Sequence, residues 1–212
     1  FNCYYGDGFD LSVYEDTFLF VVSLGYLSSC RSDFYSLGNS TRSCANDLAQ
    51  LYSFHSDNFY DFVDGNFSFC IFDKVTKKTI LAKDKMGSRP LYTCNQQDYF
   101  LFSSNQKFFL NNASIKISLD NETMANYLAL KIQEADRTFF NEIRRLIPFT
   151  VLFLDNNSLE ISYRKHSFSR THLSLNNPVK AFKDKFETAI KRCGRDPVKI
   201  GLMFSGGLDS SS

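Results

Sequence analysis

The most restrictive feature of the sequence is a pair of adjacent glycines at the end of an apolar run. Residues 198–204 are apolar except for Lys199 and Gly201, which is typical of a parallel strand buried on both faces. Before this run, Asn177 and Pro178 suit the start of a helix, and apolar residues recur at helical spacing up to residue 190. A helix, a buried strand and a glycine loop in this order predict an α/β nucleotide-binding sheet.

The loop after this strand has the composition of a phosphate-binding turn. Gly206 and Gly207 let backbone N–H groups approach an anion without a Cβ in the way, and Ser205 and Ser210 add hydroxyl donors. The N-terminus of a following helix would favour the same anion. Asp209 would repel a bare phosphate, so we expect it to bind a Mg²⁺ ion shared with pyrophosphate. The loop therefore predicts an ATP site that uses Mg²⁺.

Other glycine motifs fit this loop less well. A Walker A loop requires a lysine after its last glycine, whereas Leu208 follows Gly207. A hydrolase nucleophile elbow requires a glycine at position 203, where the chain has Met203. A plain structural turn would require neither the serines nor the aspartate. Phe204 precedes the loop and is either a nucleotide contact or part of the core strand.

The preceding residues predict a strand-rich α+β domain over residues 1–165. Alternating or apolar runs predict strands at 18–22, 67–72, 79–82, 91–93, 99–102, 151–154 and 159–163. The four strands between 67 and 102 are expected to pair in order as a meander. Helical spacing predicts one helix at 46–54 and another after the cap residue Asp120, with Met124, Tyr127 and Leu128 as its buried stripe. A polar stretch at 166–176 is the expected linker to a second domain at 177–212.

Composition argues against several functions. The net charge of +1 gives no electrostatic basis for binding nucleic acid or an anionic membrane. The longest apolar run, at 18–27, is well short of the ~20 residues that a membrane span requires. The six cysteines are scattered without a C-x-x-C pair, so we expect reduced thiols, and the histidines share no metal-ligand spacing with them. We therefore expect a cytoplasmic protein without a zinc site.

Several segments in order resemble the asparagine synthetase family. The loop, extended by Ser211, matches the S-G-G-L-D-S-S sequence of that family. Four segments ahead of it also carry the resemblance, namely D-G-N-F-S-F-C-I-F-D at 64–73, D-K-M-G-S-R-P-L-Y at 84–92, F-S-S-N-Q-K at 102–107 and I-R-R-L-I-P at 143–148. Within these segments we expect Asp84, Gly87 and Arg89 to be turn and scaffold residues rather than catalytic ones.

The resemblance implies a fold, a reaction and partners. Residues 1–165 would be an α+β sandwich domain of the N-terminal-nucleophile-hydrolase type, like a type 2 glutamine amidotransferase domain. Residues 177–212 would be the first elements of an α/β parallel-sheet adenylating domain. The implied ligase activates a carboxylate as an acyl-adenylate with release of pyrophosphate, and ammonia or another amine then displaces AMP. The implied partners are a small-molecule or peptide carboxylate and an amine donor, and a homodimer stays open.

The amidotransferase half departs from the pattern of the family. The family's nucleophile is the cysteine of an M-C-G-I start, whereas Cys3 lies in F-N-C-Y without the following glycine. The family's N-G-E-I-Y-N segment is replaced by S-L-G-Y-L-S-S at residues 23–29. We therefore expect a degenerate domain that hydrolyses no glutamine. Since the chain starts at Phe1 and stops three residues after Asp209, we also expect a fragment that is inactive alone.

Three functions stay open at this point. The first is asparagine synthesis itself. The second is the same adenylation chemistry with another amine, as in a peptide- or lactam-cyclising enzyme or a sugar amidotransferase. The third is a pseudoenzyme that retains only nucleotide binding. A further cluster of basic and acidic residues after residue 212 would favour either enzyme over the pseudoenzyme.

Overall fold

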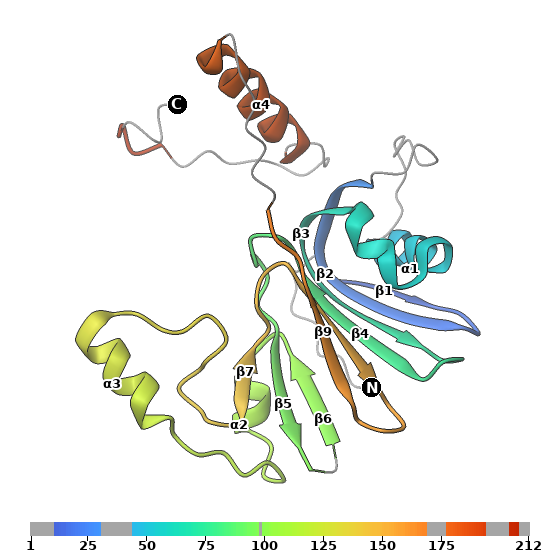
Figure 1. Ribbon diagram of the computed structural model, residues 1–212, viewed down its shortest axis with the longest axis vertical. Coiled ribbons are helices and arrows are strands. Elements are labelled where there is room, and N and C mark those ends of the chain that lie inside the picture. Colours follow the sequence, from blue (N-terminus) through green and yellow to red (C-terminus); the bar gives the residue numbers. More distant parts are fainter. Residues whose placement is uncertain (1–10, 31–43, 98, 169–176, 194–203, 208–212) are drawn as a thin grey trace. The chain divides into compact units, whose positions relative to one another are not determined.

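The computed structural model describes residues 11–30, 44–97, 99–168, 177–193 and 204–207 of the chain. It divides into two compact units, residues 1–168 and residues 169–212 (Figure 1). The first unit contains nine strands and three α-helices within its described residues, and the second contains one described helix.

The larger sheet of the first unit has six strands, all antiparallel, in the order β1-β2-β3-β4-β8-β9. They are β1 (Leu11–Glu15), β2 (Leu19–Cys30), β3 (Val63–Asp73), β4 (Lys78–Lys83), β8 (Thr150–Asp155) and β9 (Ile161–Lys165). The register aligns Val21, Ile71, Ile80 and Phe153 in one row across four strands. Because side chains alternate along a strand, this row faces one side of the sheet.

Helices cover that side of the sheet. Helix α1 (Cys44–His55) and the 3₁₀ helix η1 (Ser56–Phe62) lie against it (Figure 1). Leu48 and Leu51 of α1 and Phe59 of η1 are fully or almost fully buried there, in the same cluster as Val21 and Ile71 of the sheet. Burying each such side chain contributes roughly 1.5–3 kcal/mol, so this layer holds much of the core.

A second sheet covers the opposite side. It consists of β5 (Tyr92–Gln96), β6 (Tyr99–Ser103) and β7 (Ile143–Arg145), in the order β6-β5-β7. Leu81 and Leu152 of the larger sheet pack in one cluster with Leu91, and with Phe100 and Phe102 of β6. On its outer side the second sheet packs against the short helix α2 (Lys107–Leu110), whose Phe109 is fully buried with Cys94 and Ile143. The expected α+β sandwich is therefore confirmed.

The expected strands and the helix at 46–54 are present, but the expected meander of four strands is wrong. Strands β3 and β4 belong to the larger sheet, whereas β5 and β6 belong to the smaller one. The free edge of β4 pairs with β8, whose apolar side chains suit a central position. Between β4 and β5 the chain turns through Gly87, which has φ +68°, and Pro90, which has no N–H to continue a ladder.

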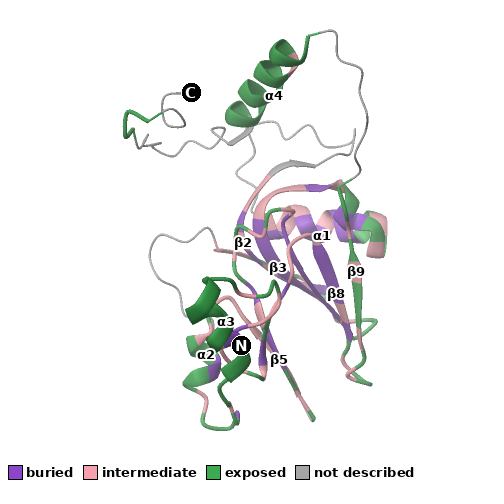
Figure 2. Cartoon of the chain, turned by 60° about the vertical axis from the view of Figure 1, so that its left-hand side comes forward, coloured by how far each residue is buried: buried purple, intermediate pink, exposed green. Residues whose placement is uncertain are grey.

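Helix α3 (Asn121–Leu130) confirms the expected cap but not the expected buried stripe. The Asp120 carboxylate accepts the Thr123 N–H at 3.0 Å, as an N-cap residue does. However, Tyr127 is 39% exposed and Leu128 is 70% exposed. Figure 2 shows α3 almost entirely in the colour of exposed residues. The helical period was recognised correctly, but its apolar side is only partly covered: Met124 is half-buried, and the Tyr127 ring contacts the Phe139 ring, with centroids 5.2 Å apart.

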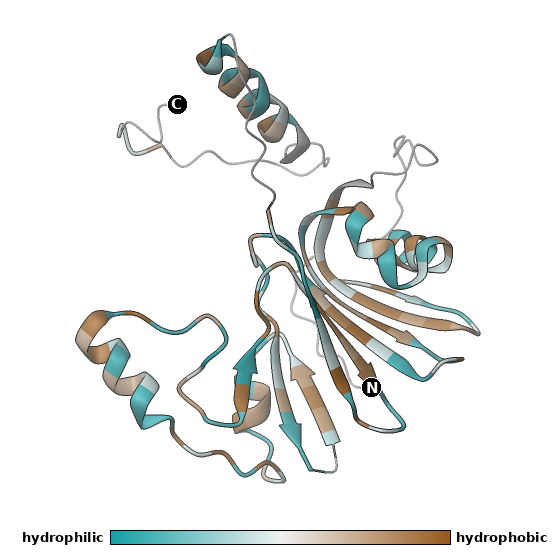
Figure 3. Cartoon of the chain, in the orientation of Figure 1, coloured by the Kyte–Doolittle hydropathy of each residue, from teal (hydrophilic) through white to brown (hydrophobic). Residues whose placement is uncertain are grey.

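The described part of the second unit is helix α4 (Pro178–Cys193) and residues 204–207. The Asn177 side chain accepts the Lys180 N–H at 3.0 Å, which confirms the expected helix start. Apolar and polar residues alternate in bands along α4 (Figure 3), and Val179, Phe182 and Ile190 are all more than half exposed. Residues 198–203 of the expected strand lie outside the described residues, so this strand stays a prediction.

Two other expectations concern the described residues as a whole. No helix among them is long and apolar enough to cross a membrane. Cys70 and Cys94 are free thiols, as expected. Burial raises the pKa of the Cys70 thiol to about 12, so Cys70 is an unreactive core residue. The side chains of Cys3, Cys30 and Cys193 lie outside the described part of the chain.

Candidate functional site

Asp84 joins two of the segments on which the resemblance rests, and it also binds Phe149, the residue that follows the third. Its side chain is almost fully buried at 2% exposure, and its carboxylate accepts N–H groups of Phe67 at 3.2 Å, Met86 at 2.8 Å and Ser88 at 3.0 Å. Its backbone N–H donates to the Phe67 carbonyl at 3.0 Å, and its own carbonyl accepts the Phe149 N–H at 3.2 Å. A carboxylate occupied in this way holds backbone together, which agrees with the scaffold role expected for Asp84.

Gly87 brings the segment ending in Pro148 against the same turn. Its φ of +68° is in the left-handed region, and a Cβ on it would lie 2.6 Å from Pro148 Cγ. A little further along, the Leu146 N–H donates to the Leu91 carbonyl at 2.9 Å. Only glycine satisfies both the backbone conformation and this close approach. The motif segments at 64–73, 84–92 and 143–148 therefore meet in one place.

Lys83 is a buried cation at the same place, which the sequence reasoning missed. It is 2% exposed, and its Nζ would lie 3.2 Å from a Cβ on Gly87. Burial, with a contribution from Arg145, lowers the pKa of Lys83, while Asp84 acts in the opposite direction. Strand alternation from Leu81 would have predicted an inward Lys83. Because Lys83 is almost fully buried, we assign it a structural role.

Residues 23–29, where the family's N-G-E-I-Y-N segment is expected, are the second half of strand β2. The Ser23 hydroxyl is 2.8 Å from the Ser12 hydroxyl, and Ser23 is 1% exposed. Gly25 has φ +98°, and a Cβ on it would lie 2.0 Å from the Asn66 carbonyl oxygen. A register irregularity follows at Leu27. Positions 23–27 thus carry neither an amide nor a carboxylate side chain, and Cys3 lies outside the described residues.

The described part of the glycine loop is residues 204–207. Phe204 is 65% exposed, and its neighbours Ser205, Gly206 and Gly207 are exposed as well. Gly206 has φ +76°, and the position of a Cβ on it has no heavy atom within 4 Å. A left-handed residue is one half of the backbone nests that bind anions, and no heavy atom crowds this side of Gly206. The phosphate-binding role of the loop stays a prediction.

The remaining predicted site residues, Asp209 and Ser210, lie outside the described residues. The structure therefore neither brings them to Gly206 nor separates them from it. No group of three or more potential metal ligands occurs within the described ranges, which exclude Asp209. The Mg²⁺ ligand role of Asp209 stays a prediction.

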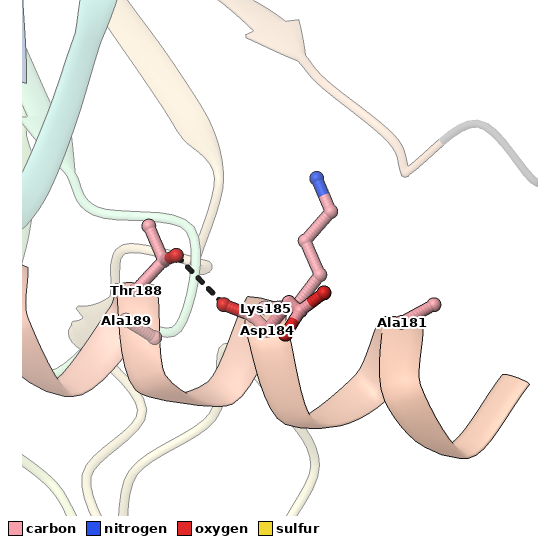
Figure 4. A pocket seen from close by; sticks show the side chains of 5 residues that line it. All are labelled: Ala181, Asp184, Lys185, Thr188 and Ala189. Carbon is pink, nitrogen blue, oxygen red and sulfur yellow. Dashed lines mark hydrogen bonds between the residues drawn. The ribbon is translucent and has the colours of Figure 1, made fainter.

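A shallow pocket runs along one side of α4 (Figure 4). Its lining residues are Ala181, Asp184, Lys185, Thr188 and Ala189. The Thr188 hydroxyl donates to the Asp184 carbonyl at 2.7 Å, an ordinary bond within a helix. All of the lining side chains come from a single helix and point outward, so this pocket is a helix surface rather than a site built to hold a ligand.

Comparison with known proteins adds to this geometry. Residues 31–167 match the family model of a glutamine amidotransferase domain. The glutamine-hydrolyzing asparagine synthetase 3 of Bacillus subtilis is 26% identical over 167 residues, which cover 78% of this chain and 27% of that protein. The amidase chry2 of Gibberella zeae is 24% identical over 194 residues, which cover 88% of this chain and 28% of that protein.

A solved structure is also similar to this chain. The glutamine phosphoribosylpyrophosphate amidotransferase of B. subtilis superposes with a TM-score of 0.44 at 15% identity, over 75% of this chain and 31% of that one. The chain spans only about a quarter of the length of the curated relatives named above. On its motifs, the matched domain and these relatives, the chain belongs to the asparagine synthetase family and carries a glutamine amidotransferase domain over residues 31–167.

Proposed function

We propose that this chain is the front part of an ATP-dependent, amide-forming ligase of the asparagine synthetase type. The observation that carries the proposal is the order of its parts. A glutamine amidotransferase domain at 31–167 is followed by an S-G-G-L-D-S-S loop at 205–211. The first part alone would suit many enzymes that use ammonia, and the loop alone would suit many that cleave ATP. Their combination in one chain favours adenylation of a carboxylate followed by transfer of an amine.

In this proposal the loop holds the pyrophosphate part of ATP. The backbone N–H groups of Gly206 and Gly207 and the hydroxyls of Ser205 and Ser210 bind its oxygens. Support comes from the left-handed conformation of Gly206 and the open space around it. We propose that Phe204 contacts the nucleotide, and its 65% exposure supports this role because the ring is accessible.

Asp209 would hold Mg²⁺, whose charge offsets the negative charge that develops on the leaving pyrophosphate. The carboxylate substrate attacks the α-phosphorus of ATP, giving an acyl-adenylate. An amine then attacks the acyl carbon and displaces AMP. The loop's own contribution is to orient the pyrophosphate and to stabilise it as it departs. We further propose that this chemistry takes place in the cytoplasm.

We propose that the amidotransferase domain does not supply ammonia from glutamine. The support is strand β2, whose residues 23–27 lack the asparagine and glutamate that the family has there. The test uses the full-length polypeptide that contains residues 1–212, supplied with glutamine and ATP. We expect glutamate release far below the rate of ATP turnover, with free ammonia supporting full activity. Glutamate release at a rate comparable to ATP turnover would contradict this part of the proposal.

A second candidate is the same adenylation chemistry with a different substrate, either another carboxylate or another amine. It is favoured by the amidase chry2, which matches 88% of this chain, against 78% for the asparagine synthetase. Incubation of the full-length polypeptide with aspartate, ATP and ammonia divides the two candidates. Asparagine and AMP in equal amounts would support asparagine synthesis. AMP formation only when another carboxylate or amine is supplied would support the second candidate.

A further inference from the structure

His166 closes the end of the first unit, directly after strand β9. Its backbone N–H donates to the Phe149 carbonyl at 2.9 Å. Its ring stacks on the Phe149 ring, with centroids 5.2 Å apart and planes 25° apart, and lies 4.9 Å from the Tyr60 ring. The centroid of the Phe168 ring lies 5.0 Å from that of the Phe149 ring. Residues 166–168 are thus held to the body of the unit by an aromatic cluster around one imidazole.

Burying the neutral form of this imidazole costs little free energy, whereas burying its protonated form costs much more. Its Nδ1 lies 3.3 Å from the Asp61 carboxylate, whereas its Nε2 is buried with no hydrogen-bond partner among the described residues. A neutral ring with its proton on Nδ1 leaves only an unused acceptor at Nε2. A protonated ring has a second N–H there, with positive charge and no acceptor, which is far more costly to bury.

The charged groups around the ring act in both directions. Asp61, on η1, favours the protonated ring, but its side chain is 58% exposed, so water screens its effect. Arg164, on the same strand end, disfavours protonation, and the Lys85 ammonium lies 6.0 Å from the Phe149 ring centre and is itself paired with Asp64. Burial is the largest effect, and together with Arg164 it lowers the pKa of His166 below its ordinary value of 6.5, against the opposing effect of Asp61.

We propose that His166 is a proton-released clamp, which holds residues 166–168 against Phe149 and η1 when neutral and releases them when protonated. The segment so released is the last one before the second unit, which begins at residue 169. A His whose pKa is lowered in the folded state contributes its full stability above about pH 6.5. That contribution is lost as the pH falls from there through the folded-state pKa.

Two measurements on the whole chain test the clamp. The first is an NMR titration of the histidine rings, in which we expect the pKa of His166 to lie below 6.5. The second is amide hydrogen exchange at residues 163–168, corrected for the intrinsic pH dependence of exchange. We expect the opening constant to rise by up to about tenfold per pH unit as the pH falls below about 6.5. A pKa of His166 at or above 6.5, or an opening constant independent of pH, would overturn the proposal.

Two variants separate titration from packing. His166→Phe keeps an aromatic ring against Tyr60 and Phe149 but removes the proton, so its opening constant should no longer change between pH 7.5 and 5. His55→Phe is the matched control, because His55 also stacks on an aromatic ring, with Phe62 at 4.0 Å. It should keep the response of the unaltered chain. If His166→Phe retains that response, or His55→Phe loses it, another group is the sensor. The NMR titration decides the question even if a variant fails to fold.

Discussion

At the scale of single residues, Asp84 and Gly87 hold the turn where residues 64–73 and 84–92 meet Pro148 and Phe149. Asp84 and Gly87 were predicted to be scaffold residues, and the structure shows a buried carboxylate that binds backbone N–H groups and a glycine in a left-handed turn. Lys83 was missed because a lysine at the end of an apolar run resembles an ordinary strand end. Arg145, which contributes to the lowered pKa of Lys83, is distant in sequence, and the close approach of Gly87 to the Lys83 amine follows from the turn rather than from the strand.

The buried carboxylate of Asp84 gives a stability prediction. Asp84→Ala leaves the N–H groups of Phe67, Met86 and Ser88 without their acceptor, so we expect a loss of about 3 kcal/mol or more. Urea unfolding measures it, with an unchanged m-value. Asp155→Ala is the matched control, because Asp155 also accepts two backbone N–H groups in a turn but is exposed to solvent. An equal or larger loss in the Asp155 variant would contradict this account of Asp84.

Gly206 gives a prediction that separates binding from folding. Gly206→Ala meets no neighbouring atom, so its cost to stability is limited to backbone strain of about 1 kcal/mol. The same change shifts the turn that presents the N–H groups, so we expect at least tenfold weaker binding of pyrophosphate with Mg²⁺ by the full-length polypeptide. Calorimetric titration measures this affinity. Unchanged affinity would remove the proposed role of Gly206.

At the scale of elements, local patterns predicted which segments form strands and helices but not how they pair. The strands that became β3, β4, β5 and β6 were all recognised, yet they belong to two sheets. Pairing depends on β8, which is distant in sequence and takes the open edge of β4. For α3, helical spacing of apolar residues indicated a buried face, but the described residues leave Leu128 and much of Tyr127 exposed. The spacing of apolar residues shows which side of a helix is apolar, but it does not show whether another segment packs against that side.

The two helices α1 and α3 allow a direct comparison. Leu48 of α1 is fully buried, whereas Leu128 of α3 is 70% exposed. Leu48→Ala should therefore destabilise the first unit by about 2–5 kcal/mol, through lost burial and the cavity left behind. Leu128→Ala should change its stability by no more than about 0.5 kcal/mol. Thermal unfolding of the two variants measures both effects, and similar losses would mean that α3 is covered in solution.

At the scale of the whole molecule, the order of the motifs carried more information than any one of them. The sandwich and its family follow from segments at 64–73, 84–92 and 143–148, which the fold brings together around Asp84 and Gly87. The catalytic part of the loop could be predicted only from residue types and from the resemblance. Of the six predicted ATP-site residues, the structure describes Phe204, Ser205, Gly206 and Gly207, and the two with the most specific chemistry lie outside it.

The most direct test of the proposed function is which bond of ATP the full-length polypeptide cleaves. The products are separated after incubation with ATP, Mg²⁺, ammonia and a panel of carboxylates that includes aspartate. We expect AMP and pyrophosphate, formed only when the right carboxylate is present and lost in an Asp209→Asn variant. Formation of ADP and phosphate, or of AMP at the same rate in the variant, would contradict the assignment of this loop.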